Sequence, residues 1–197
     1  PMGSFKITLE NSKPINYLLI GAGSGITPLL SMITSVLDKE SENICHLLYG
    51  NRDEESIIFK SKLERLALVY PNRFSVEYVL SKPIISKEKG VFSFLNKGKQ
   101  TWTGYTGRIN ETLIADFLKK KQTDKINEYY ICGPGAMIEA SVAALENLKI
   151  DKSLEHREYF TSADPKAVEE TDALSDTKEE LKKAINTLDG ETTELSI

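Results

Sequence analysis

The chain has 197 residues, of which 40% are hydrophobic, with 25 Lys and Arg against 29 Asp and Glu. This composition is typical of a globular protein and excludes the fibrous and wholly disordered classes. The apolar runs are shorter than the roughly 18 residues that a membrane-spanning helix needs, and the first residues lack the basic-then-apolar order of a signal peptide. We therefore expect a cytoplasmic protein with no membrane partner.

Charge divides the chain into two parts. Residues 161–197 carry 10 acidic and 4 basic side chains, which leaves 19 acidic and 21 basic side chains in residues 1–160. We expect residues 161–182 to form a solvated linker, because they cannot bury enough apolar surface to pack. The nearly neutral body has no clustered basic face, so we expect no nucleic-acid partner and interpret the three lysines at 119–121 as the solvated end of a helix.

Five short runs of β-forming residues predict strands within residues 13–160. They cover 17–20, 44–49, 74–80, 129–132 and 155–160. Segments of helical periodicity lie between these runs. Their apolar stripes are Leu29, Ile33, Val36 and Leu37; Phe59, Leu63, Leu66 and Tyr70; Leu113, Ile114, Phe117 and Leu118; Ile138, Val142, Leu145 and Leu148. Strands that alternate with helices imply right-handed crossovers and a parallel sheet covered on both faces. The sequence predicts a doubly wound α/β domain with a five-stranded parallel sheet.

The pattern lapses between residues 81 and 106, where we expect a long, mostly irregular connection from the third strand to the next helix. Long connections in compact domains are often functional. Trp102, the single tryptophan, is expected to hold this connection against the domain, and a contact surface for a ligand or partner is the alternative.

Cysteine and histidine usage argues against several kinds of site. Cys45 and Cys132 lie in apolar runs, which indicates reduced core thiols rather than a disulfide framework, and no zinc or iron-sulfur spacing is present. His46 lies within one predicted strand and His156 near the end of another. We expect both histidines to be packing or surface residues rather than catalysts.

A glycine-rich loop directly follows the first predicted strand. It reads Gly21-Ala22-Gly23-Ser24-Gly25-Ile26-Thr27-Pro28. Glycine lets the backbone approach an anion closely, and the free amides of the following helix favour a phosphate. Pro28 suits the first turn of that helix. The pattern is G-x-G-x-G rather than the dehydrogenase G-x-G-x-x-G, because Ile26 occupies the place of the third glycine. The loop predicts a pyrophosphate site, with a merely tight turn as the alternative.

The second predicted strand ends in Tyr49-Gly50-Asn51-Arg52. A typical NAD-binding unit carries an acid here for the ribose hydroxyls, whereas this chain carries a base. Arg52 and Lys60 could pair with a ribose 2′-phosphate, which favours NADPH over NADH. The alternative is an exposed arginine that the acidic residues at 53–55 neutralise.

Together with Cys132-Gly133-Pro134-Gly135-Ala136-Met137, these stretches resemble the NAD(P)-binding domain of the ferredoxin-NADP reductase superfamily. The resemblance covers residues 1–160. It implies a cofactor site of Gly21, Gly23, Ser24, Gly25, Thr27 and Pro28 at the pyrophosphate and nicotinamide side, and Asn51, Arg52 and Lys60 at the adenosine ribose. It further implies that Cys132 lies beside the nicotinamide, with Gly133, Pro134 and Met137 shaping that wall. Glu158 and Phe160 match the positions that approach the flavin, so the resemblance implies Cys132 and Glu158 as the catalytic pair.

Both ends of the chain resemble pieces of neighbouring domains. Residues 1–12 resemble the end of a FAD-binding barrel, and the barrel itself is missing from the sequence. Residues 183–197 predict a β-hairpin around Asp189-Gly190, and such a hairpin begins the plant-type ferredoxin module of some reductases. No iron-sulfur ligands follow it. We therefore expect a sequence truncated at both ends, which most resembles the reductase subunits of the phenylacetyl-CoA epoxidase type, from phenylacetate catabolism, and their relatives.

The resemblance implies a flavoprotein oxidoreductase that passes electrons from NADPH, or NADH, through FAD and a [2Fe-2S] cluster to an oxygenase partner or another electron acceptor. This chain is expected to bind nicotinamide nucleotide weakly and to be nearly inactive alone, because it should hold neither FAD nor the cluster. One alternative is a nucleotide-binding module without redox activity. An ordinary Rossmann dehydrogenase is a third interpretation, and the absent third glycine and the lack of an acid/base pair count against it.

Overall fold

The computed structural model describes residues 5–7, 13–39, 42–86, 99–159, 184–188 and 191–195, with the backbone alone at 86, 99–100 and the last two segments. Contacts divide the chain into two units, Pro1–Phe160 and Thr161–Ile197. The predictions made for residues 1–4 and 8–12, Phe160, the linker at 161–182 and the turn at 189–190 lie outside the described residues.

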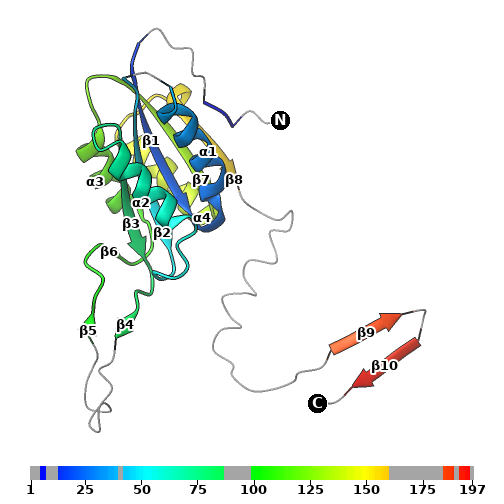
Figure 1. The fold of residues 1–197 in the computed structure, drawn as a ribbon. Helices are drawn as coiled ribbons and strands as arrows, with labels where there is room; N and C mark the ends of the chain where they lie inside the picture. The colour runs from blue at the N-terminus through cyan, green and yellow to red at the C-terminus, as the bar shows by residue number, and fades with distance from the viewer. Residues whose placement is uncertain are drawn as a thin grey trace. The chain divides into compact units, whose positions relative to one another are not determined.

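In its described residues the first unit contains a parallel sheet and four α-helices, which Figure 1 shows with their labels. Its elements are β1 (Ile15–Ala22), the 3-10 turn η1 (Gly23–Gly25), α1 (Ile26–Leu37), β2 (Ile44–Asn51), α2 (Lys60–Val69), β3 (Phe74–Leu80), β4 (Ile85–Ser86), β5 (Lys99–Gln100), β6 (Tyr105–Thr106), α3 (Glu111–Lys121), β7 (Ile126–Gly133), α4 (Gly135–Asn147), the 3-10 turn η3 (Lys152–Leu154) and β8 (Glu155–Tyr159). The sheet order is β6-β3-β2-β1-β7-β8, and every neighbouring pair is parallel.

The sheet has six strands, so the predicted count of five is wrong. The five predicted strands are all present, and the sixth is β6, which pairs with Val79 and Leu80 at the edge of the sheet. Two residues are too few to show the alternation that marks a strand in the sequence. The expected irregular connection also contains the short antiparallel pair of β4 and β5.

Helices cover both faces of the sheet, as a doubly wound domain requires. Alternate residues of β1 enter different cores, because successive strand side chains point to opposite faces. Tyr17 and Leu19 pack with α1 and α2, and Leu18 and Ile20 pack with α3 and α4. All four side chains are fully buried. The predicted α/β layering is confirmed.

The second predicted helical stripe contains one error, at Phe59. This residue precedes α2 in the left-handed conformation, with φ of 58°, and its side chain is 47% exposed. The left-handed residue turns the chain into the helix, so the core-facing stripe begins one turn later at Leu63, which is fully buried. No helix among the described residues is both long and apolar enough to cross a membrane.

The second unit contains β9 (Ala184–Leu188) and β10 (Glu191–Leu195). The two strands pair antiparallel, with Leu188 opposite Glu191. This pairing is the one that the alternation on both sides of the predicted turn favours.

Candidate functional site

The glycine loop lies at the carboxyl end of β1, in the centre of the sheet (Figure 1). The chain leaves β1 toward β2 on one side and later returns as β7 on the other side. This reversal of direction is the topological switch point, where open α/β sheets form a crevice for ligands at the carboxyl ends of their strands.

The glycines of the loop pack directly against the Cys132-to-Met137 segment. A Cβ on Gly25 would overlap the backbone carbonyl of Cys132. A Cβ on Gly133 would lie 2.8 Å from Met137 Cε and 3.3 Å from the backbone nitrogen of Ala22. Only glycine allows these approaches, so two motifs that lie more than 100 residues apart in the sequence form one surface.

The outer side of the same loop is open. Gly23 has φ of +53°, and no atom lies within 4 Å of the position that its Cβ would occupy. The side chains of Ser24 and Thr27 are exposed, and Pro28 occupies the first turn of α1 as predicted. The start of a helix, exposed hydroxyls and uncrowded backbone are features that fit a phosphate.

Cys132 forms the inner wall of this surface and faces Glu158 across neighbouring strands. The two residues are register partners on β7 and β8. Burial raises the pKa of the Cys132 thiol to about 11, and the negative charge of Glu158 adds to this effect. The thiol is therefore protonated near neutral pH and provides an uncharged wall rather than a thiolate nucleophile. The side chain of Glu158 is exposed.

The start of α4 continues this wall. Pro134 is the N-cap residue of α4 and is exposed, whereas Met137 is only 6% exposed and packs toward Gly133. Phe160, the remaining predicted residue of this region, lies outside the described residues. The structure thus brings the glycine loop, Cys132 and the first turn of α4 together.

Arg52 follows β2 at the same edge of the sheet. Its side chain is 74% exposed, and its Nε lies 3.7 Å from Asp53 Oδ2. Lys60 is the first residue of α2 and is half-buried. The contact with Asp53 agrees with the alternative of a neutralised arginine, and the exposure leaves the guanidinium open to a ligand. Both interpretations of Arg52 therefore remain compatible with the geometry.

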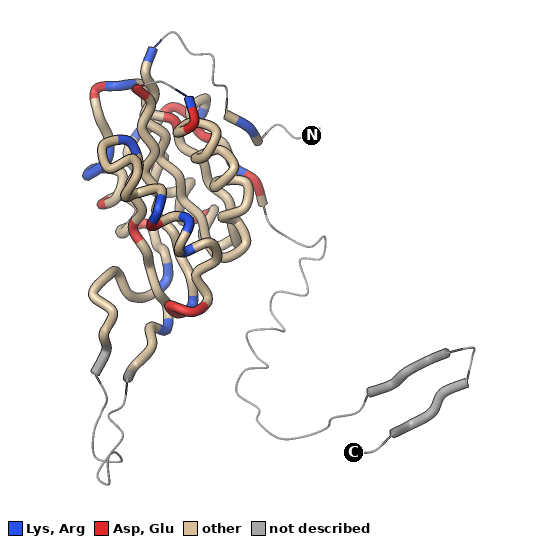
Figure 2. Tube along the Cα trace, viewed as in Figure 1, with Lys and Arg blue, Asp and Glu red and all other residues tan. Residues whose placement is uncertain are grey.

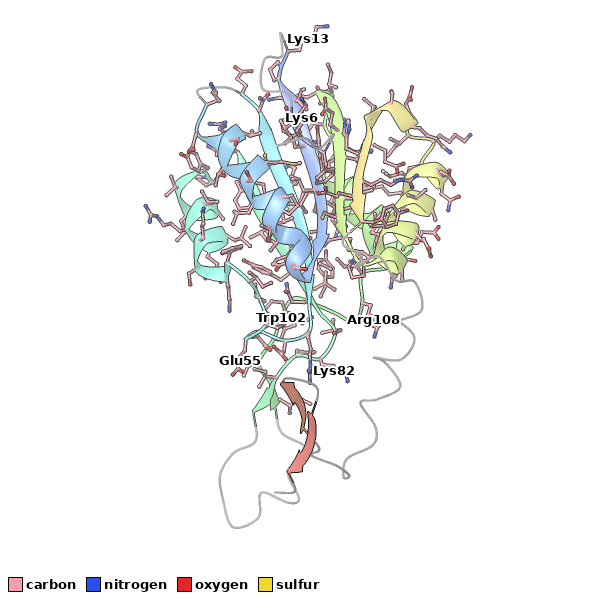
Figure 3. All side chains as sticks on the ribbon, turned by 90° about the vertical axis from the view of Figure 1, so that its right-hand side faces the viewer. Lys6, Lys13, Glu55, Lys82, Trp102 and Arg108 are labelled. Carbon is pink, nitrogen blue, oxygen red and sulfur yellow. The ribbon has the colours of Figure 1, made fainter. Side chains whose placement is uncertain are left out.

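Two further basic residues at this edge were not predicted from the sequence. Lys82 follows β3, and its backbone N–H donates to the Arg52 carbonyl at 2.6 Å. Arg108 follows β6 and precedes Ile109, whose Cδ1 lies 2.9 Å from the position of a Cβ on Gly50. Figure 3 shows Lys82 and Arg108 at the same end of the domain, opposite Lys13. Figure 2 shows this end to be mixed in sign, with acidic residues beside the basic ones. For Lys82, a base two residues after the predicted strand at 74–80 was the available signal, whereas Arg108 had none because β6 was not predicted.

Trp102 fixes the long connection to the domain. Its Nε1 donates to the Tyr105 carbonyl at 2.9 Å, and its ring lies edge-on to Tyr78 with centroids 6.4 Å apart. A Cβ on Gly104 would lie 2.5 Å from the indole. These contacts agree with the pinning role that the sequence favoured.

The two histidines make packing contacts. His46 Nδ1 lies 2.7 Å from Ser75 Oγ, and burial lowers the pKa of His46 to about 4, with Lys121 acting in the same direction. His156 stacks on Tyr130 with ring centroids 4.5 Å apart. Across the described segments, His, Cys, Asp and Glu side chains form no group of three or more that could hold a metal ion.

Comparisons with known proteins agree with this geometry. Residues 19–143 match the family model described as oxidoreductase NAD-binding domain. The chain is 30% identical over 176 residues to a component of the 1,2-phenylacetyl-CoA epoxidase of Escherichia coli strain K12, covering 89% of this chain and 46% of the relative. It is 34% identical over 194 residues to the ferredoxin reductase component of 3-ketosteroid-9-alpha-monooxygenase of Mycobacterium tuberculosis, covering 98% of this chain and 46% of the relative.

A solved structure shows the same similarity in three dimensions. The CS-b5R domains of human Ncb5or in the NAD+ form superpose with a TM-score of 0.61 at 30% sequence identity, over 73% of this chain and 36% of that chain. The chain spans about half the length, or less, of the curated relatives described above.

Proposed function

Because the chain belongs to the oxidoreductase NAD-binding domains of the ferredoxin-NADP reductase superfamily, we propose that it is the nucleotide-binding part of a reductase that passes electrons from NADPH through FAD and a [2Fe-2S] cluster to an oxygenase. The observation that carries the proposal is the contact of Gly25 with the Cys132 carbonyl at the switch point of the sheet. The names of two relatives, a monooxygenase reductase component and an epoxidase component, support the oxygenase partner.

The glycine loop is the part of the site that would hold the pyrophosphate. Its open backbone at Gly23 and the exposed hydroxyls of Ser24 and Thr27 lie at the start of α1, where the helix dipole favours an anion. Gly21 allows the close approach of the helix, because a Cβ there would lie 2.7 Å from Leu29 Cδ1. These residues bind and orient the nucleotide, and orientation is the main contribution of the protein in cofactor chemistry.

The wall of Cys132, Gly133, Pro134 and Met137 would hold the nicotinamide. When bound, the nicotinamide supplies a hydride to a flavin, which converts the electron pair into single electrons. The protonated Cys132 thiol gives that ring an uncharged neighbour. Glu158, the register partner of Cys132, is the carboxylate that we propose near the flavin side of the wall.

The basic residues at the same edge favour NADPH over NADH. Arg52 and Lys60 were proposed for the 2′-phosphate from the sequence, and Lys82 and Arg108 add two positive charges at the ends of neighbouring strands. Arginine recognises phosphate through paired donors, and such charge-assisted hydrogen bonds are stronger than neutral ones. Asn51 lies beside this group, since its carbonyl accepts the Ser81 N–H at 3.0 Å.

Calorimetric titration with 2′-phospho-AMP and with AMP at low salt tests this specificity, because it isolates the adenosine half of the nucleotide. We expect tighter binding of 2′-phospho-AMP than of AMP. Arg52→Ala should lower the ratio of the two affinities by about tenfold, which corresponds to the loss of one charge-assisted contact. Arg65→Ala is the matched control, because Arg65 is an exposed arginine on α2. Equal binding of both ligands would overturn the NADPH assignment, and binding of neither would overturn the nucleotide site.

A second experiment addresses the domain organisation that we propose. Residues 1–12 would end a FAD-binding barrel, residues 161–182 would form a linker, and residues 183–197 would begin a ferredoxin-like module, an assignment that the antiparallel pairing of β9 and β10 supports. On this proposal the purified chain shows almost no NADPH-dependent dye reduction. Robust dye reduction without an added flavin domain would contradict it. Family membership favours this redox role over a nucleotide-binding module without redox activity.

A further inference from the structure

Tyr49, a side chain outside the predicted set, reaches the glycine loop. Its hydroxyl donates to the Gly23 carbonyl at 2.9 Å. The same carbonyl accepts the N–H of Ile26, the first residue of α1, in the hydrogen bond that closes the 3-10 turn η1. One oxygen is therefore held by two donors, one from strand β2 and one from the helix.

This pair of hydrogen bonds fixes the direction of a backbone amide. A trans peptide is planar, and its C=O and N–H point in opposite directions. Because the Gly23 carbonyl points toward Tyr49, the N–H of the following residue, Ser24, points away from it. Gly23 has a left-handed φ, and no atom lies within 4 Å of its Cβ position. Packing therefore adds little to the two hydrogen bonds that orient the peptide between Gly23 and Ser24.

The ring of Tyr49 is itself held in place. It is fully buried and faces Tyr78, its register partner on β3, with ring centroids 6.3 Å apart. Tyr78 in turn contacts Trp102, which fixes the long connection. Burial raises the pKa of Tyr49 to about 12, so the hydroxyl keeps its proton and remains a donor at neutral pH.

Tyr78 shows that the hydroxyl, rather than the ring, distinguishes the two tyrosines. Both rings occupy the same row between β2, β3 and the connection. Yet the Tyr78 hydroxyl is buried with no hydrogen-bond partner among the described residues, whereas the Tyr49 hydroxyl reaches the loop. An unsatisfied buried hydroxyl costs free energy, so the Tyr78 hydroxyl contributes nothing that phenylalanine would lack. The Tyr49 hydroxyl, in contrast, makes a hydrogen bond that phenylalanine could not make.

We propose that Tyr49 is a positioning residue for the pyrophosphate of the bound nucleotide. It acts through the peptide between Gly23 and Ser24, which it holds so that the Ser24 amide faces outward at the start of α1. The inference rests on the proposed function, since it assigns the pyrophosphate to the glycine loop. It adds a residue of β2, far from the loop in sequence, that sets the geometry of the loop.

The test compares Tyr49→Phe with Tyr78→Phe by calorimetry, using NADP+ and adenosine 2′-phosphate as separate ligands. Each substitution removes one oxygen and keeps the ring, so both variants should fold. Adenosine 2′-phosphate lacks the pyrophosphate and therefore reports on the adenosine end alone. We expect Tyr49→Phe to weaken NADP+ binding about three- to tenfold, the effect of one hydrogen bond, and to leave adenosine 2′-phosphate binding unchanged. Tyr78→Phe should change neither.

Hydrogen exchange at the loop provides the second measurement. The Ile26 amide, which donates to the Gly23 carbonyl, should exchange faster in Tyr49→Phe than in the unsubstituted chain, while the amides of β7 should not change. Unaltered NADP+ binding, or an equal loss for both ligands, would overturn the positioning role. If the unsubstituted chain binds neither ligand, the proposed nucleotide site fails. If it binds both and only the Tyr49→Phe result is negative, the proposed function stands and this inference alone is wrong.

Discussion

The two ends of the sheet use their polar groups in different ways. At the amino ends of the strands, side chains close on the backbone: Asn43 Oδ1 accepts the Ile15 N–H at 2.8 Å, and Asn16 Nδ2 donates to the Lys121 carbonyl at 2.9 Å. At the carboxyl ends, the glycine loop packs on Cys132 by backbone alone and leaves the Ser24 hydroxyl exposed. Buried polar groups at the first end stabilise the fold, and open polar groups at the second end are available to a ligand.

Arg73 shows the contrast between the two ends on a single helix, α1. Its guanidinium donates to the Val36 carbonyl at 2.8 Å and to the Leu37 carbonyl at 3.3 Å, in the last turn of α1, and to Asn43 at 3.1 Å. A cation is therefore placed at the negative end of the helix whose positive end faces the glycine loop. One helix thus has a C-terminus completed by the protein and an N-terminus left for an anion. We expect substitutions at the two ends to separate stability from binding.

The largest combined effect, on stability and on affinity together, is expected for Gly25→Ala, because the added Cβ would overlap the Cys132 carbonyl. The backbone atoms must then move apart, and such overpacking should lower the free energy of unfolding by about 1–3 kcal/mol. NADP+ affinity should fall by at least about tenfold, because the glycine loop and residues 132–137 would separate. Gly135→Ala is the control for stability, because no atom lies within 4 Å of its Cβ position. Urea unfolding and calorimetry measure the two quantities, and a Gly25→Ala protein with normal affinity would contradict the role of this contact.

Arg73→Ala should do the reverse. Loss of a charged donor to several carbonyls should lower the free energy of unfolding by about 2–3 kcal/mol, with NADP+ affinity unchanged. Arg65→Ala, which removes an exposed arginine from α2, should leave the free energy of unfolding nearly unchanged. A drop in affinity for the folded Arg73→Ala protein would show that the two ends of α1 are not separable.

A smaller effect is expected from the pH dependence of His46, which lies in the amino half of β2. Burial lowers its folded-state pKa from 6.5 to about 4. Between those values the unfolded chain binds a proton that the folded chain does not, so stability is lost as the pH falls from 6.5 toward 4. After allowance for solvent screening, we expect a loss of about 1 kcal/mol between pH 7 and 5.

His46→Asn keeps an acceptor for Ser75 and should flatten this part of the stability profile. Urea unfolding at pH 7 and pH 5 measures the difference between the variant and the unsubstituted chain. An identical loss of stability in both proteins would show that another group causes it.

The sequence predicted the middle of the sheet better than its ends. Strands β1, β2, β3 and β7 carry enough apolar residues for the period of two, or the continuous apolar run of a buried strand, to stand out. The two residues of β6 carry no such signal, and its position depends on pairing with β3. The left-handed Phe59 was likewise missed, because a conformation that only a few per cent of non-glycine residues adopt cannot be read from an apolar spacing.

The sequence predicted the motifs of the candidate site but not the contacts between residues that are far apart in the chain. The glycine loop and the segment after Cys132 were visible because each is a local pattern. The hydrogen bond from Tyr49 to Gly23 and the approach of Lys82 to Arg52 join residues that are 26 and 30 positions apart. Such contacts follow from the order of the strands in the sheet, and no local pattern contains that order.

The most direct test of the central claim is the amide NMR spectrum of this chain during titration with NADP+. The account predicts that the largest shifts occur at the glycine loop (residues 21–25) and at residues 132–137, with further shifts near Arg52 and Lys82. The amides of Asn16, Asn43 and Lys121 at the opposite end of the sheet should not move. Shifts confined to that opposite end, or no shifts at saturating nucleotide, would contradict the assignment of the carboxyl end as the nucleotide site.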